Sequence, residues 1–117
     1  MDFHQEFEKS IKAFPCIEGL IFADPDGEAI LFEAPTIDHF DLKLAGAKMP
    51  IMLQAYQFAG INQKPTFLEF MYENRYVITV CLIDQYTITV IAKNPREKGR
   101  LRHHLKILAK KFNQDIF

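Results

Sequence analysis

The chain has 117 residues, of which 49% are hydrophobic and 25% are charged, and its formal net charge is −1. This length fits one domain, residues 1–117, but not a catalytic core with a separate substrate cap. The composition excludes a mainly disordered chain. No apolar run approaches the roughly 18 residues that cross a bilayer, and the acidic N-terminus is unlike a signal peptide. The sequence therefore predicts a cytoplasmic protein without membrane insertion.

The first half of the chain predicts a helix, a β-hairpin and a second helix. Residues 3–14 carry Phe and Ile at steps of four, four and three, which is the spacing of one helical face. Two short apolar runs, residues 17–23 and 29–32, have the pattern of paired strands. From residue 38 to residue 60 the period becomes helical again, and Asp38 is the expected N-cap.

The stretch DPDG at residues 24–27 follows an apolar strand and allows two interpretations. It resembles the start of the phosphoryl-transfer site of haloacid-dehalogenase-type phosphatases, where the two Asp residues act as nucleophile and general acid. That motif has Thr or Val at the position of Glu28, and it has an acidic pair directly after a further strand. In this sequence a lone Asp84 stands at the corresponding place after the later strands. Pro fixes φ and Gly allows a positive φ, so a hairpin turn explains the stretch better. We therefore expect no catalytic residues there.

The second half predicts a three-stranded meander and a last helix. The strands are residues 66–72, 75–83 and 86–92, and the turns between them are short enough for tight hairpins. A proline at residue 95 ends the last strand and opens the helix. The apolar stripe of this helix comprises Leu101, Leu105, Leu108 and Phe112. The predicted fold class is therefore α+β, in the order α-β-β-α-β-β-β-α.

The helix predicted over residues 38–60 is apolar on two sides. One side comprises Phe40, Leu44, Ile51, Ala55 and Phe58, and the other comprises Leu42, Ala45, Met49, Met52, Leu53 and Tyr56. Such a helix is either buried between two layers of its own domain, or covers a sheet with one side and offers the other to a second protein. Pro50 removes a backbone hydrogen bond and clashes with the carbonyl of Gly46, so we expect a kink near residues 48–50.

The strand predicted over residues 66–72 is also apolar on both faces, which suits a sheet covered on both sides. As the first strand of a meander it is expected at an edge of the sheet. A long apolar edge with unpaired backbone groups is a liability unless another strand pairs with it.

The charged residues are distributed unevenly. Residues 1–41 contain ten acidic and two basic side chains, whereas residues 93–117 contain eight basic and two acidic ones. This pattern predicts that the first and last helices lie side by side. The alternative is a basic docking face for an acidic partner. Nucleic acid is not an expected partner, because the basic segment has no interleaved aromatic residues for base stacking.

Motifs for common chemistry are missing. The four histidines include no pair at the i, i+4 spacing of a zinc site, and neither common glycine-rich nucleotide-binding motif occurs. Cys16 and Cys81 are expected to be buried free thiols rather than a disulfide or metal site. The sequence thus predicts no catalytic residues, no metal and no cofactor.

Three stretches carry a resemblance to a known family. CIEGLIFADPDGEAIL at residues 16–31 looks like a strand that runs into an Asp-Gly hairpin, and residues 44–59 look like an Ala- and Leu-rich second helix. YTITVIAKNP followed by GRLRHHLKIL looks like a last strand and helix. Together with the order of elements, they resemble the roadblock/dynein light chain family, in its prokaryotic GTPase-regulating type. Pro50 in KMPIML departs from the usual second helix of the family.

The resemblance implies a five-stranded antiparallel sheet covered by helices on both faces, as in roadblock and profilin-like domains. It also implies a dimer in which the strand at residues 66–72 pairs with its partner copy and the second helices pack together. The residues expected at the dimer interface are Thr66, Leu68, Phe70, Tyr72, Met49, Met52 and Tyr56.

Members of that family scaffold or regulate small Ras-like GTPases, and some are dynein adaptors. In the dimer, the paired second helices are expected to form an apolar platform that such a partner contacts. The residues expected at the rim of this platform are Lys43, Lys48, Gln54 and Gln57. Two classes of function therefore remain. The first is a non-enzymatic homodimer that scaffolds or regulates a small Ras-like GTPase, including as a GTPase-activating partner. The second is a small-ligand sensor, an adaptor without a GTPase, or an enzyme with a site between helix and sheet.

Overall fold

The elements of the fold follow the predicted order in a computed structural model, which describes residues 2–57, 65–93 and 96–116. The helices are α1 (Phe3–Ala13), α2 (His39–Gln57) and α3 (Lys98–Ile116). The strands are β1 (Ile17–Ala23), β2 (Ala29–Glu33), β3 (Phe67–Met71), β4 (Arg75–Cys81) and β5 (Thr87–Lys93). The expected helical residues 58–60 lie outside the described part of the chain.

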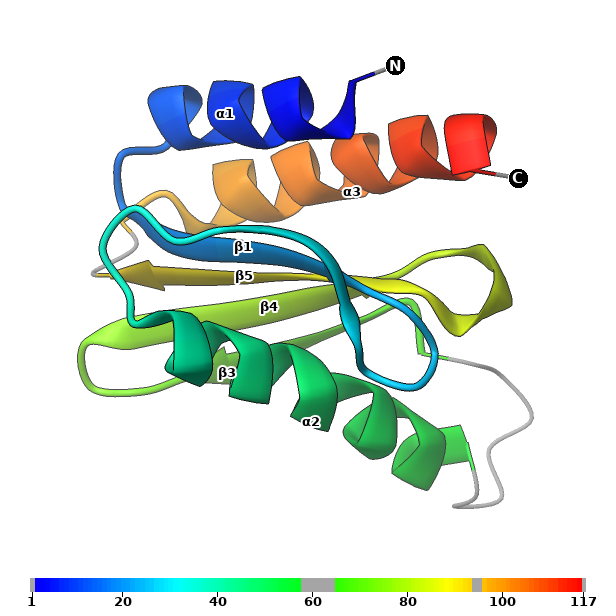
Figure 1. Cartoon of the computed structure of the whole chain (residues 1–117). Coiled ribbons are helices and arrows are strands. Elements are labelled where there is room, and N and C mark those ends of the chain that lie inside the picture. The colour runs from blue at the N-terminus through cyan, green and yellow to red at the C-terminus, as the bar shows by residue number, and fades with distance from the viewer. Residues whose placement is uncertain (1, 58–64, 94–95, 117) are drawn as a thin grey trace.

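The strands form one antiparallel sheet in the order β2-β1-β5-β4-β3. The helices α1 and α3 cover one face of this sheet, and α2 covers the other (Figure 1). The predicted fold class, an α+β fold with a five-stranded antiparallel sheet covered on both faces, is confirmed. The strand β3 lies at an edge of the sheet, as its place at the start of the meander predicted.

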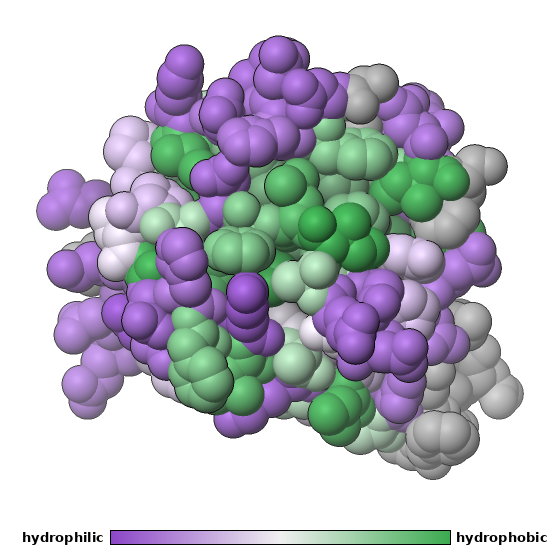
Figure 2. Space-filling model, viewed as in Figure 1, coloured by the Kyte–Doolittle hydropathy of each residue, from purple (hydrophilic) through white to green (hydrophobic). Residues whose placement is uncertain are grey.

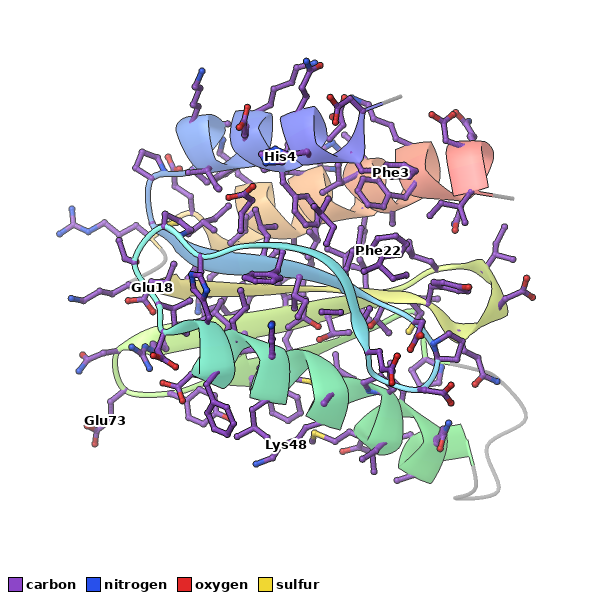
Figure 3. The ribbon with its side chains drawn as sticks, viewed as in Figure 1. Phe3, His4, Glu18, Phe22, Lys48 and Glu73 are labelled. Atoms are coloured by element: carbon purple, nitrogen blue, oxygen red, sulfur yellow. The ribbon has the colours of Figure 1, made fainter. Side chains whose placement is uncertain are left out.

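Each face of the sheet has its own hydrophobic core. The larger core lies under α1 and α3 and includes the fully buried side chains of Phe7, Tyr76 and Phe112. Phe3 of α1 and Phe22 of β1 meet between helix and sheet (Figure 3), with ring centroids 6.1 Å apart. The predicted apolar stripe of α3 is buried there along its whole length. The smaller core lies under α2 and comprises Ile21, Ile37, Leu42, Met49, Val77 and Ile91.

The stretch at residues 24–27 is a turn, as predicted. One carboxylate oxygen of Asp24, Oδ1, accepts hydrogen bonds from the backbone N–H groups of Asp26 and Glu28, each at 2.9 Å. Gly27 has a φ of +83°, which other residues rarely adopt. A Cβ atom at Gly27 would lie 3.0 Å from the Cα of Ala47, so the turn packs closely against α2. The Asp24 carboxylate thus serves the backbone of the turn.

The second helix begins as predicted and continues through its proline. Oδ1 of Asp38 accepts from the backbone N–H groups of Phe40 at 2.9 Å and Asp41 at 3.2 Å, which caps the N-terminus. The helix spans 19 residues without interruption, and Pro50 is inside it. The proline therefore does not end the helix, although it leaves the carbonyl of Gly46 without its usual helical donor.

The first and last helices lie side by side, as the charge pattern predicted (Figure 1). An ion pair joins them, in which Nζ of Lys111 lies 3.5 Å from Oε2 of Glu6. A buried polar contact lies between the helices: Ser10 Oγ donates to the carbonyl of Glu6 at 2.9 Å and lies 2.7 Å from Nε2 of His104. Since the hydroxyl proton is already used, Nε2–H of His104 donates to Ser10.

The free energy of unfolding is expected to decrease as the pH falls below about 6.5. Burial lowers the pKa of His104; Lys111 and His103 act in the same direction, and Glu6 opposes them. The unfolded chain therefore takes up a proton at a pH where folded His104 is still neutral. Urea denaturation at about pH 7.5 and about pH 5.5 measures the effect. His104→Gln should reduce this pH dependence, and His39→Gln, at an exposed position on α2 across the sheet, should not. Equal slopes in both variants would contradict the assignment.

Candidate interaction surface of α2 and β3

An apolar stripe on α2 faces away from the sheet. Phe40 is 70% exposed, Leu44 is 41% exposed and Ile51 is 68% exposed. Lys48 lies between Leu44 and Ile51 on the same side of the helix, and its side chain points away from the sheet (Figure 3). Figure 2 shows apolar side chains interrupted by polar ones along the lower front of the molecule, where α2 lies. We call Phe40, Leu44, Lys48 and Ile51 the α2 stripe.

A glycine lies on the side of α2 that packs against the sheet. A Cβ atom at Gly46 would lie 2.9 Å from Cδ1 of Ile21, so any larger residue would require the Ile21 side chain to shift. Leu42 and Met49 are buried on the same side. Of the two arrangements that the two-sided pattern allowed, the chain therefore adopts the one in which α2 covers the sheet with one side and exposes the other.

The strand β3 presents a free edge beside α2. Its register places Phe70 opposite Val77 of β4, and its other edge has no neighbouring strand within the described parts of the chain. Phe67 packs against the larger core and Phe70 against the smaller one, so both faces of the strand are used. At the end of the strand, Met71 and Tyr72 are more than half exposed. The edge is therefore apolar and accessible.

A polar network attaches this edge strand to α3. Nε of Arg102 lies 2.6 Å from Oε1 of Glu69, and its Nη2 donates to Oε2 at 2.9 Å. The hydroxyl of buried Tyr76 also donates to Oε2, at 2.8 Å. Burial raises the pKa of Glu69, but hydrogen bonds from Arg102 and Tyr76 outweigh it and hold the pKa below its usual value. Burial and the nearby Glu69 carboxylate raise the pKa of Tyr76 to about 12. These contacts therefore fix the position of the edge strand within the single chain.

A shallow apolar groove of about 250 Å³ separates α2 from the edge strand. Its walls include Leu44, Met49 and Met52 of α2, and Phe70 and Val77 of the sheet. The α2 stripe, this groove and the free edge of β3 form one continuous surface.

The residues predicted for the dimer interface differ in exposure. Thr66, Tyr72 and Tyr56 are exposed, whereas Leu68, Phe70 and Met52 are half-buried. Met49 is buried against the chain's own sheet. The prediction omitted the exposed apolar residues of the α2 stripe, Phe40, Leu44 and Ile51. Gly46 was the available signal, because a glycine amid apolar helix residues marks a side that packs closely.

The residues predicted to contact a partner lie on α2. Lys43, Lys48 and Gln54 are exposed, and Nζ of Lys43 lies 4.8 Å from the ring centroid of Phe32 on β2. The side chain of Gln57 lies outside the described residues. Lys48 is the member of this set that stands within the α2 stripe.

The described residues contain neither a metal-binding cluster nor a membrane-spanning helix. In residues 2–57, 65–93 and 96–116, no three His, Cys, Asp or Glu side chains gather as they would around a metal ion. Within the same ranges, no helix has the length and apolar character needed to cross a membrane. Cys16 and Cys81 are both free thiols, as predicted, but each is half-buried and not fully buried.

Solved structures resemble this chain over nearly its whole length. A Roadblock/LC7 domain from Streptomyces avermitilis matches with a TM-score of 0.84 and 12% identity, over 99% of this chain and 98% of that one. Myxococcus xanthus MglB matches with a TM-score of 0.80 and 13% identity, over 96% and 92%. An MglB structure with a tetrameric arrangement matches with a TM-score of 0.81 and 10% identity, over 96% and 85%.

The sequence itself gives no such match: no protein-family model and no curated protein matches it. The chain has the Roadblock/LC7 fold, and the family resemblance inferred from its sequence is confirmed at the level of the fold. The particular structures similar to it include MglB proteins. A shared fold does not assign a function, which has to be argued from the surface.

Proposed function

We propose that this chain is a non-enzymatic interaction module, which forms a homodimer through α2 and β3 and binds a small Ras-like GTPase. The observation that carries the proposal is the continuous apolar surface made by the α2 stripe, the groove and the free edge of β3. Exposed apolar surface of this kind marks interaction sites, and an unpaired apolar edge strand is a template for pairing.

A second copy of the chain is the simplest partner that would pair with the edge of β3 and cover the apolar surface. A two-fold axis beside β3 would pair the two edges with each other and bring the two α2 helices onto the same side of a joined sheet. The contacts of Glu69 with Arg102 and Tyr76 already order the edge strand, which reduces the entropy lost on association. The tetrameric arrangement of one MglB structure supports self-association for a protein of this fold.

The GTPase part of the proposal rests on the fold likeness to MglB and on the role that the family resemblance implies. Lys48 on the stripe, with Lys43 and Gln54 on its borders, would give the platform the polar rim typical of protein interfaces. The helix α2 contains no arginine that could act as an inserted finger. Any stimulation of GTP hydrolysis would therefore come from ordering the GTPase's own residues.

Binding to small Ras-like GTPases of the same organism is expected to depend on the nucleotide. Each GTPase is loaded with GDP or with a non-hydrolysable GTP analogue, and its affinity for the chain is measured by calorimetry. One nucleotide state should bind at least about tenfold more tightly, because only a difference in affinity can couple binding to the switch. Lys43→Glu should weaken this binding while the mass of the protein in solution stays unchanged, because Lys43 lies towards Phe32 of β2 and outside the groove.

The matched control is Lys110→Glu, at an exposed position on α3 across the sheet. It reverses the same charge and should leave binding unchanged. If no GTPase binds in either state and another protein does, the chain is an adaptor and the GTPase part of the proposal is wrong.

A further inference from the structure

A second and larger cavity, of about 500 Å³, lies at the end of the sheet where β4 turns into β5. The C-terminal half of α2 and the two residues just before β3, Pro65 and Thr66, form its other walls, at the right-hand end of the molecule in Figure 1. Pro50, Leu53 and Leu82 supply apolar surface. A volume of several hundred Å³ with apolar walls and a few polar groups is characteristic of small-molecule sites.

The wall of this cavity contains a buried hydroxyl group without a partner. Thr87 is 1% exposed, and its Oγ1 makes no hydrogen bond with the described residues. In the next cross-strand pair on the same face, the hydroxyls of Thr79 and Thr89 form a hydrogen bond with each other at 2.8 Å. An unpaired buried hydroxyl is unfavourable, so a ligand group that bonded to Thr87 would gain from it.

The residue opposite Thr87 does not supply that bond. Cys81 faces Thr87 across the register of β4 and β5 and also lines the cavity. Burial raises the pKa of the Cys81 thiol to about 11, so the thiol is protonated and neutral at physiological pH. A thiol is only a weak hydrogen-bonding group. This part of the wall is therefore uncharged, and the hydroxyl group of Thr87 has hydrogen-bonding capacity that the wall does not use.

The charges on the described wall of the cavity disfavour anionic ligands. No Lys, Arg or His is among the described residues that line it, and Asp84 is the charged residue that does. Phosphates and carboxylates would thus lack a counter-charge and would meet a carboxylate.

We propose that this cavity binds a neutral, mostly apolar small molecule that carries one hydroxyl group, and that Thr87 Oγ1 hydrogen-bonds to that group. The site is built from α2, the two residues just before β3 and the β4–β5 turn, and it does not depend on the proposed GTPase partner. Because α2 also forms the interaction surface, a ligand here would contact one element of that surface.

The test uses two probes of the same ring system, 2-naphthol and 2-naphthoate, and follows the backbone amides by NMR. The neutral 2-naphthol should give saturable shifts at Thr87, Cys81 and Leu53, and 2-naphthoate should bind at least about tenfold more weakly. Thr87→Val keeps the shape and removes the hydroxyl, and should weaken 2-naphthol binding by about tenfold. Thr87→Ser keeps the hydroxyl and should retain most of the affinity.

Thr89→Val is the matched control, since it removes a buried hydroxyl on the same face outside the cavity and should leave the affinity unchanged. Three results would overturn the proposal: no saturable shifts at these residues, equal binding of the anionic probe, or equal affinity of Thr87→Val and wild type. A dimer that forms but binds no 2-naphthol would reject this site without touching the proposed function.

Discussion

Replacing Ile51 by Asp is expected to convert a dimer into a folded monomer. Ile51 is 68% exposed and lies on the side of α2 that faces away from the sheet, so the isolated chain tolerates a charge there. In a two-fold dimer each substitution occurs twice, and the carboxylates would lose water without gaining a partner. Light scattering at micromolar concentration should change from twice 13.6 kDa to 13.6 kDa, while the circular dichroism spectrum stays unchanged.

The matched control for this prediction is Ile107→Asp. Ile107 is 41% exposed on α3, on the opposite face of the sheet, so the same chemical change there should leave the dimer mass unchanged. Phe70→Lys is a less selective test, because Phe70 packs against the smaller core and its loss would also destabilise the monomer. A wild-type chain of monomer mass at this concentration would refute the homodimer itself.

The fold could be predicted from the sequence because its local signals agree. The spacing of Leu101, Leu105 and Leu108 gave the buried stripe of α3, and the DPDG stretch gave the β1–β2 turn. Alternation in residues 66–72 indicated a strand with both faces covered, and its edge position followed from the short turns of the meander. Each of these signals depends on residues close in sequence, where spacing alone determines which side chains share a face.

The candidate surface could be predicted only in part. The two apolar sides of α2 were visible in the sequence, but hydrophobicity is nearly equal on both and does not say which side meets the sheet. The side that meets the sheet carries Leu42 and Met49 together with Gly46, which lies close to Ile21, a residue 25 positions away in the sequence. The attachment of Glu69 to Arg102 is likewise invisible in sequence spacing, because the fold alone brings the two side chains together.

Replacing Phe112 by Ala is expected to cause the largest loss of stability, because this side chain joins three elements of the larger core. Its ring lies 4.4 Å from that of Phe3, 5.7 Å from that of Phe7 and 5.2 Å from that of Phe22, measured between centroids. It is fully buried. Removing a buried Phe ring leaves a cavity and costs about 3–5 kcal/mol, against a total of about 5–15 kcal/mol for a typical domain.

Urea denaturation measures this loss, and the protein concentration has to be the same for every variant because dimer formation would add to the apparent stability. The exposed Ile107 on the same helix provides the control, and Ile107→Ala should change the free energy of unfolding by no more than about 0.5 kcal/mol. Phe112→Leu should lose less than Phe112→Ala, since it fills part of the cavity. If Phe112→Ala unfolded at nearly the wild-type urea concentration, the ring cluster between α1, α3 and β1 would not stabilise the domain. The attachment of both helices to the sheet would then depend on the remaining leucines of α3.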